Sequence, residues 1–228
     1  MSSLLAGVDR GATGAFKGLL RTPLALAPGL PQGGIQRGSL VGVSGAGGTT
    51  LLFSLLVEWL AQGSWAAVVG PPDLGLEAAS AMGVDMERLA LIPCPGSGWA
   101  DVVTVLLGSL DLVVLRPPVR CRPQVARRLA ARVREQGSIL VLTGGMGWPD
   151  TPDIDLIVVA GAWEGLGLGS GTLKRRPATV TVSGRRAGTP RKVDCWLPGT
   201  DGRLSPRESI MSSRVEMLEP EQEMSCAG

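Results

Sequence analysis

The stretch that decides the fold is Leu40-Val-Gly-Val-Ser-Gly-Ala-Gly-Gly-Thr-Thr-Leu51, where an apolar run enters a glycine-rich turn and then a second apolar run. A strand that turns through glycines into a helix surrounds an anion with backbone N–H groups and a helix N-terminus. The pattern approaches the phosphate-binding motif G-x-x-x-x-G-K-[ST], but Gly48 occupies the lysine position. The candidate nucleotide-binding positions are Gly42, Gly45, Gly47, Gly48, Thr49 and Thr50.

Glycine at position 48 removes the fixed charge that the lysine brings to the β- and γ-phosphates. Loss of one such donor costs about 3–4 kcal/mol of transition-state stabilisation. The backbone donors leave room for weak ATP binding without catalysis, and we expect no true cofactor. A tight glycine turn with no ligand is the alternative interpretation of this loop.

Two further positions that an ATPase needs are also altered. An acid should follow a neighbouring strand to hold the Mg²⁺ shell, but Arg116 follows the apolar run 112–115. A catalytic carboxylate should follow another strand, and after the run 66–69 only Asp73 is near, behind two prolines. Because all three positions change together, the sequence predicts a protein that is not an enzyme, with no catalytic residues.

Outside the loop, short apolar runs alternate with helix-like segments. The runs that read as strands are 40–43, 66–69, 89–92, 112–115, 139–142 and 156–160. The helix-like segments are 49–62, 75–82, 99–109 and 123–136, the last with Pro123 in its first turn and Gly137 at its end. Continuous apolar strands separated by helices predict an α/β fold with a mainly parallel sheet flanked by helices.

The C-terminal third changes character. The alternating segment 178–183 and the run 193–197 predict an antiparallel β-hairpin that extends the sheet. We therefore expect an N-terminal arm at residues 1–28, one domain at 29–197 and a flexible tail at 198–228. A helix over residues 4–20 is conceivable, but four glycines weaken it.

Composition narrows the function classes. The chain has no histidine, and no two of Cys94, Cys121, Cys195 and Cys226 form a CxxC pair, so a Cys/His metal site is not expected. No apolar run approaches the roughly 18 residues of a membrane span, and no secretory signal is recognisable. The expected location is cytoplasmic. The six tryptophans are spread singly, which favours core packing.

Charge is unevenly distributed although the net charge is only +2. Seven arginines and no acid lie between Arg116 and Arg134, a second basic stretch covers 174–192, and the end of the chain is acidic. The first stretch is either a solvated helix face or a sequence-independent surface for DNA phosphates. The candidate phosphate contacts are Arg120, Arg122, Arg127 and Arg128.

Residues 29–51, including the glycine loop, resemble the entry strand and loop of the RecA family. Residues 68–93, with Gly-Pro-Pro-Asp and then Ala-Met-Gly-Val-Asp-Met-Glu-Arg-Leu-Ala-Leu-Ile-Pro, resemble it too, and more narrowly the RecA-like ImuA and ImuA-prime accessory proteins of bacterial mutasomes. The likeness covers about residues 29–186. Residues 143–154 are short and acidic where active RecA proteins have a long DNA-gripping loop, so strand exchange is not expected.

The resemblance implies a non-catalytic scaffold in the SOS response, acting in damage-induced translesion DNA synthesis and located at the nucleoid after damage. Its implied partner is ImuB, a Y-family-like polymerase homologue, which links to an error-prone C-family polymerase and the sliding clamp. The implied docking residues are Arg175, Arg176, Arg185, Arg186 and Trp196. The alternatives are a modulator of single-stranded DNA or RecA filaments, and a weakly active RecA-type ATPase.

Overall fold

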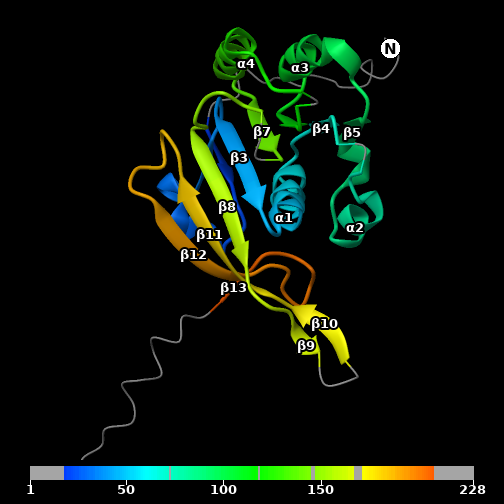
Figure 1. Cartoon of the computed structure of the whole chain (residues 1–228), viewed down its shortest axis with the longest axis vertical. Coiled ribbons are helices and arrows are strands. Elements are labelled where there is room, and N and C mark those ends of the chain that lie inside the picture. Colours follow the sequence, from blue (N-terminus) through cyan, green and yellow to red (C-terminus); the bar gives the residue numbers. More distant parts are fainter. Residues whose placement is uncertain (1–17, 72, 118, 145–146, 167–170, 208–228) are drawn as a thin grey trace, which may run out of the picture.

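A nine-stranded sheet organises the chain in the computed structural model, which describes residues 18–71, 73–117, 119–144, 147–166 and 171–207 (Figure 1). The strand order is β13-β12-β11-β8-β3-β7-β6-β4-β5. The parallel strands are β3 (Leu40–Gly45), β4 (Ala66–Val69), β5 (Leu89–Ile92), β6 (Leu112–Leu115), β7 (Ile139–Thr143) and β8 (Ile154–Ala160). This confirms the predicted α/β fold, and the strand bounds differ by two residues at most.

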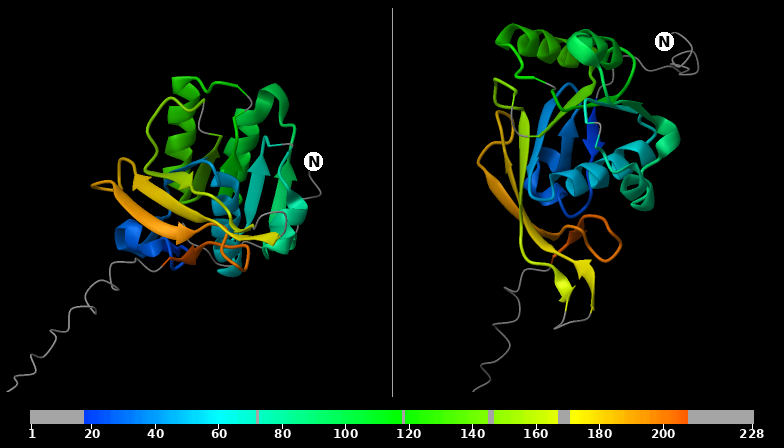
Figure 2. Two further views of the ribbon diagram at one scale, coloured as in Figure 1. Left: turned by 60° about the horizontal axis from the view of Figure 1, so that its bottom comes forward. Right: turned by 45° about the vertical axis from the view of Figure 1, so that its right-hand side comes forward.

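In the described part of the chain, four α-helices flank the sheet: α1 (Gly48–Ala61), α2 (Leu76–Ala81), α3 (Trp99–Leu107) and α4 (Pro123–Gln136). Helix α4 has the predicted bounds, because Pro123 fits the first turn and Gly137 takes the left-handed conformation, with φ of 69°, at the end. Figure 2 shows α1 and α2 on the other side of the sheet from α3 and α4. No helix in the described ranges has the length and hydropathy of a membrane span.

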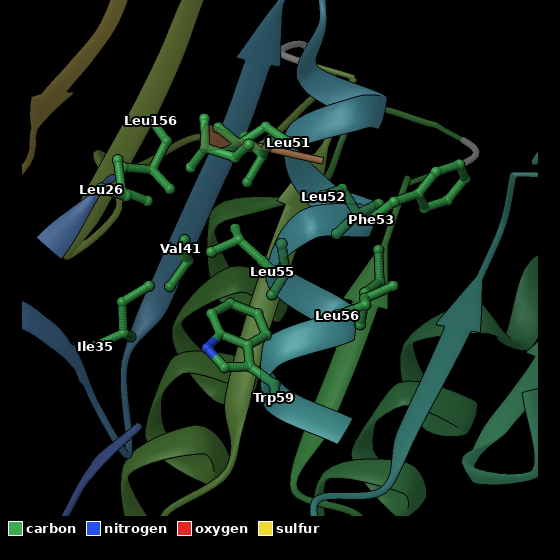
Figure 3. Close-up of a cluster of buried hydrophobic side chains, with 14 of the residues drawn as sticks. Leu26, Ile35, Val41, Leu51, Leu52, Phe53, Leu55, Leu56, Trp59 and Leu156 are labelled. Carbon is green, nitrogen blue, oxygen red and sulfur yellow. The ribbon is translucent and has the colours of Figure 1, made fainter. Parts of the chain in front are cut away.

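The sheet separates two hydrophobic cores. Helices α3 and α4 cover β4, β6 and β7 on one face, with Leu107, Leu129 and Val133 buried against them. On the other face α1 is buried almost all round, and its Trp59 belongs to the same hydrophobic cluster as Leu26 and Ile35 (Figure 3). A helix this apolar lies inside the domain, so α1 is held rigidly and its N-terminus is fixed at the end of β3.

The N-terminal boundary of the domain lies earlier than expected. Residues 18–28, assigned from the sequence to an arm, contribute β1 (Leu19–Arg21), which pairs with β2 (Gly34–Gln36), and the start of the 3-10 turn Ala27–Gly29. Leu20 and Leu26 are buried in the core beside α1. The sequence obscured this because the prolines and glycines of the segment interrupt any periodic pattern. Residues 1–17, with most of the conceivable helix over 4–20, lie outside the described residues.

The C-terminal strands extend the sheet as predicted. Strand β11 (Pro177–Ser183) pairs antiparallel with β8 on one side and with β12 (Arg191–Trp196) on the other. A separate hairpin of two short strands, β9 (Glu164–Leu166) and β10 (Gly171–Arg175), was not expected. It lies beyond the start of β11, away from α3 and α4 (Figure 1).

The expected tail also begins later than predicted. Residues 198–207 return to the domain, where β13 (Ser205–Pro206) pairs with β12. Leu204 is buried, and its amide donates to the Ser54 hydroxyl of α1 at 3.0 Å. Arg203 donates from Nε to the carbonyl of Met82 at 2.7 Å. The rest of the expected tail, residues 208–228, lies outside the described residues.

Candidate functional site

A cavity of about 370 Å³ opens where β3, β4, β6 and β7 end. Its walls include Ser44 and Gly45 from the loop, Thr49 from α1, Arg116 after β6 and Thr143 at the end of β7. The carboxyl ends of parallel strands are where open α/β sheets bind ligands. The structure therefore brings the glycine loop and the two altered ATPase positions to one cavity. We call it the loop cavity.

The loop has the backbone of an anion cradle. Gly45 has φ of 92°, and any Cβ there would collide with the Val158 carbonyl of β8. Gly47 is the N-cap of α1, and the Leu51 amide donates to its carbonyl at 2.9 Å. No side chain caps this helix, so the amides at its start have no side-chain acceptor. Gly48 and Thr49 line the cavity, whereas the Thr50 carbonyl accepts from Ser54.

Packing does not require a glycine at position 48. A Cβ at this position would have Val43 as its nearest neighbour, at an ordinary contact distance of 3.8 Å. Gly48 is also not among the residues with positive φ. The fold would therefore accept a Cβ here, so a steric conflict at that atom does not account for the missing lysine.

Arg116 and Asp73 form an ion pair in the wall of the loop cavity. The Arg116 guanidinium donates from Nη2 to Oδ1 of Asp73 at 2.5 Å and from Nη1 to Oδ2 at 3.4 Å. The hydrogen bond from Arg116 holds the pKa of the Asp73 carboxyl below its usual value. An ATPase needs an acid at each of these two positions. Here one position holds Arg116, and the Asp73 carboxylate at the other is paired with that arginine.

Magnesium does not fit this arrangement. A divalent cation beside Thr49 would meet the positive charge of Arg116, and the nearby carboxylate is engaged by that same arginine. Asp111, the other acid of this segment, lies at the opposite end of β6. It accepts from Arg37 at 2.8 Å and from the Trp65 amide at 2.9 Å, which is a structural role.

Arg176 reaches the glycine loop from the other side. Its guanidinium lies 2.7 Å from the position that a Cβ of Gly47 would occupy, and its Nε donates to the Leu197 carbonyl at 3.2 Å. It also stacks over the Trp163 ring at 5.1 Å from the centroid. Arg176 is not part of the cavity wall, so it supports the loop rather than facing the cavity.

The candidate docking residues separate into two groups at opposite ends of β11. Arg175 stacks on Trp196 at 3.9 Å and pairs with Glu164 at 2.8 Å. Arg185 and Arg186 lie at the turn after β11, where both contact the buried Asp153, at 3.1 and 3.5 Å. Arg175, Arg176 and Trp196 thus form one cluster, whereas Arg185 and Arg186 hold the hairpin against the start of β8.

The candidate phosphate contacts lie on and before α4. Arg120, Arg122 and Arg127 are exposed, and no acid within the described part of the chain pairs with them. Arg128 differs, because it pairs with Asp101 of α3 at 2.9 Å. Three of the four arginines are therefore available to an external anion.

Sequence reasoning missed a smaller cavity of about 150 Å³ beside β3 and β8, lined by Gly42, Trp148, Asp150 and Asp155 among others. Burial raises the pKa of the Asp155 carboxyl. The sequence does not reveal this smaller cavity, because the pairing of β3 with β8 joins residues more than one hundred positions apart.

Comparisons with known proteins agree with this fold. The KaiC-like protein PH0186 of Pyrococcus horikoshii superposes with a TM-score of 0.58 at 15% identity, covering 84% of this chain and all of that one. This likeness shows a RecA-type fold. Protein Rv3395c of Mycobacterium tuberculosis is 42% identical over 127 residues, which are 54% of this chain and 55% of that protein. The chain thus matches about half the length of this relative.

The family match covers the part of the chain that builds the loop cavity. Residues 28–150 match the family described as the MT3502 N-terminal domain. That range includes β3, the glycine loop, Asp73 and Arg116, and it ends before β8. Since it spans more than half of the 228 residues, the chain belongs to the MT3502 N-terminal domain family.

Proposed function

We propose that this protein is a non-catalytic RecA-like scaffold of a mutasome for damage-induced translesion DNA synthesis, which docks an ImuB-type polymerase homologue. The observation that carries the non-catalytic part is the ion pair of Arg116 with Asp73 beside Gly48. Phosphoryl transfer needs Mg²⁺ and a fixed cation on the phosphates. Among the described residues that line it, the loop cavity offers neither a free carboxylate for the metal nor a lysine.

The docking part of the proposal rests on the resemblance to ImuA-type proteins and on the cluster of Arg175, Arg176 and Trp196 at the start of β11. Arg175 and Arg207 stack on the Trp196 ring, at 3.9 and 5.1 Å from its centroid. Leu173 on the neighbouring hairpin is exposed. Aromatic and arginine side chains are enriched at protein interfaces, which makes this cluster the best candidate surface for the polymerase homologue.

The test uses substitutions, because a deletion from Leu173 would remove β11 and β12 from the central sheet. A pull-down against the purified polymerase homologue compares the full chain with Leu173→Asp and with Arg175→Glu. The control is Arg128→Glu, an exposed arginine on α4 at the far end of the molecule that also pairs with an acid. We expect the first two changes to weaken capture and the control to retain it. Unchanged capture by both variants would refute the docking surface.

The absence of catalysis is tested separately. Phosphate release from ATP in the presence of Mg²⁺ should stay at the level of the buffer. Turnover that disappears in the variant Thr49→Ala would instead identify a weakly active ATPase.

A second candidate function is supported by the three available arginines at α4. Arg120, Arg122 and Arg127 could bind the backbone of single-stranded DNA, alone or in a RecA filament. In a fluorescence anisotropy titration, this function predicts steeply salt-dependent DNA binding that weakens when Arg122 and Arg127 are both changed to alanine.

A further inference from the structure

We propose that the loop cavity binds the phosphate or diphosphate group of a small ligand without a divalent cation, with Arg116 in the place of the metal and Asp73 as an internal carboxylate that the ligand displaces. This goes beyond the scaffold role and does not depend on it, because binding to the cavity is measured without any partner protein.

The first support is the chemistry of Arg116. Its guanidinium lies in the cavity wall and is 40% exposed, so a ligand can reach it. A planar guanidinium offers paired N–H donors that match the oxygens of a phosphate. It supplies a positive charge where a phosphate-binding loop otherwise depends on Mg²⁺. Metal binding and phosphate binding are therefore separable in this protein, although they go together in an ATPase.

The second support is the start of α1. Gly48 and Thr49 line the same cavity as Arg116, and no side chain occupies the capping position of this 14-residue helix. The partial positive charge of a helix N-terminus and its free amides favour an anion. Arginine and helix start thus converge on one cavity, whose volume of about 370 Å³ lies within the range of small-molecule sites.

The third support is the anion that the chain itself provides. The Asp73 carboxylate is held by Arg116 through two contacts, which shows that this guanidinium can hold a pair of anionic oxygens. Asp73 is 69% exposed, and ion pairs between exposed side chains are weak. A phosphate carries more charge and more acceptor oxygens than a carboxylate, and it also reaches the amides of α1. It should therefore displace Asp73.

The experiment is calorimetric titration of the full chain with inorganic pyrophosphate, in buffer that contains EDTA and again with Mg²⁺. We expect saturable binding in EDTA that Mg²⁺ does not strengthen. The variant Arg116→Ala should bind about 10-fold to 100-fold more weakly, as expected for loss of a charge-assisted contact. The variant Asp73→Asn should bind several-fold more tightly, because the internal competitor loses its charge.

The matched control is Arg88→Ala, which removes an arginine of similar exposure from an exposed pair with Asp85 and should leave pyrophosphate binding unchanged. Binding that requires Mg²⁺ would overturn the proposal, as would an absence of binding in both the unaltered chain and Asp73→Asn. Equal losses in Arg116→Ala and Arg88→Ala would show non-specific attraction to surface arginines and would also overturn it. The gain expected for Asp73→Asn cannot arise from misfolding, so the proposal stays testable if Arg116→Ala is unstable.

Discussion

Asp155 on β8 lies directly beside Gly42 on β3, and its carboxylate occupies the space that any side chain at position 42 would need. A side chain at position 42 would therefore have to displace the Asp155 carboxylate, so the first glycine of the loop motif also serves the packing between two strands. The same contact leaves Asp155 half-buried in a smaller cavity, where burial raises the pKa of its carboxyl.

This environment predicts a pH-dependent effect of Asp155→Asn. Because the pKa is higher in the folded than in the unfolded protein, the ionised carboxylate opposes folding at pH 7, and the penalty falls as the pH drops through the folded pKa. Urea unfolding should show Asp155→Asn at least as stable as the unaltered chain at pH 7. The advantage should shrink toward pH 4. Glu77→Gln, at an exposed position on α2, is the control for removing a carboxylate.

Two glycines of the loop should respond oppositely to alanine. Gly45→Ala should lower the free energy of unfolding by about 2 kcal/mol or more, since the residue has positive φ and its Cβ would strike β8. Gly48→Ala should be neutral or stabilising by up to about 1 kcal/mol, because the helical position has room. Urea unfolding at pH 7 measures both, and equal losses would contradict the geometry of the loop.

A lysine at position 48 tests whether the missing lysine or Arg116 prevents ATP hydrolysis. Gly48→Lys should bind pyrophosphate about 10-fold more tightly, because it adds a second cation at an unstrained position. It should still release no phosphate from ATP, since Arg116 remains where Mg²⁺ would sit. Titration calorimetry and a phosphate-release assay give the two readings. Turnover in this single variant would show that the missing lysine alone had silenced an ATPase.

Asp153 should matter for stability. It is 3% exposed, accepts from the Leu40 amide at 2.9 Å, and contacts both Arg185 and Arg186. Asp153→Ala should cost about 3 kcal/mol or more in urea unfolding, because three groups lose a buried acceptor.

Asp101→Ala, which breaks only the exposed pair with Arg128, should change stability by less than about 1 kcal/mol. Changing Arg185 and Arg186 to alanine should lower stability but leave capture of the polymerase homologue intact. A loss of capture without a loss of stability would show that Arg185 and Arg186 contact the polymerase homologue directly.

The cysteines should differ sharply in reactivity. Cys94 is exposed, whereas burial raises the pKa of the Cys121 thiol and raises that of Cys195 to about 11. At pH 8 only about one Cys195 thiol in a thousand would be ionised, and the thiolate is the reactive form. In the variant Cys226→Ser, a disulfide reagent should therefore modify one thiol quickly and the others only after unfolding. Rapid reaction of a second thiol would contradict the burial of Cys121 and Cys195.

The sequence predicted the parallel strands, the four helices, the hairpin of β11 with β12, and the altered residues at positions 48 and 116. These features are local, since each follows from a run of apolar residues, a glycine or proline at its end, or a residue missing from a short motif. The sequence also located Arg116 correctly at the end of β6, because the acid of an ATPase directly follows its own apolar strand.

Only the tertiary structure decided what those residues contact. The ion pair of Arg116 with Asp73 depends on β4 and β6 being neighbours in the sheet, and Arg185 reaches Asp153 because β11 lies beside β8. The burial of Leu20, Leu26 and Leu204 around α1 depends equally on contacts between distant segments. Local pattern determines which element a segment forms. Which charges meet is decided by strand order, because pairing brings together residues that the chain separates by tens of positions.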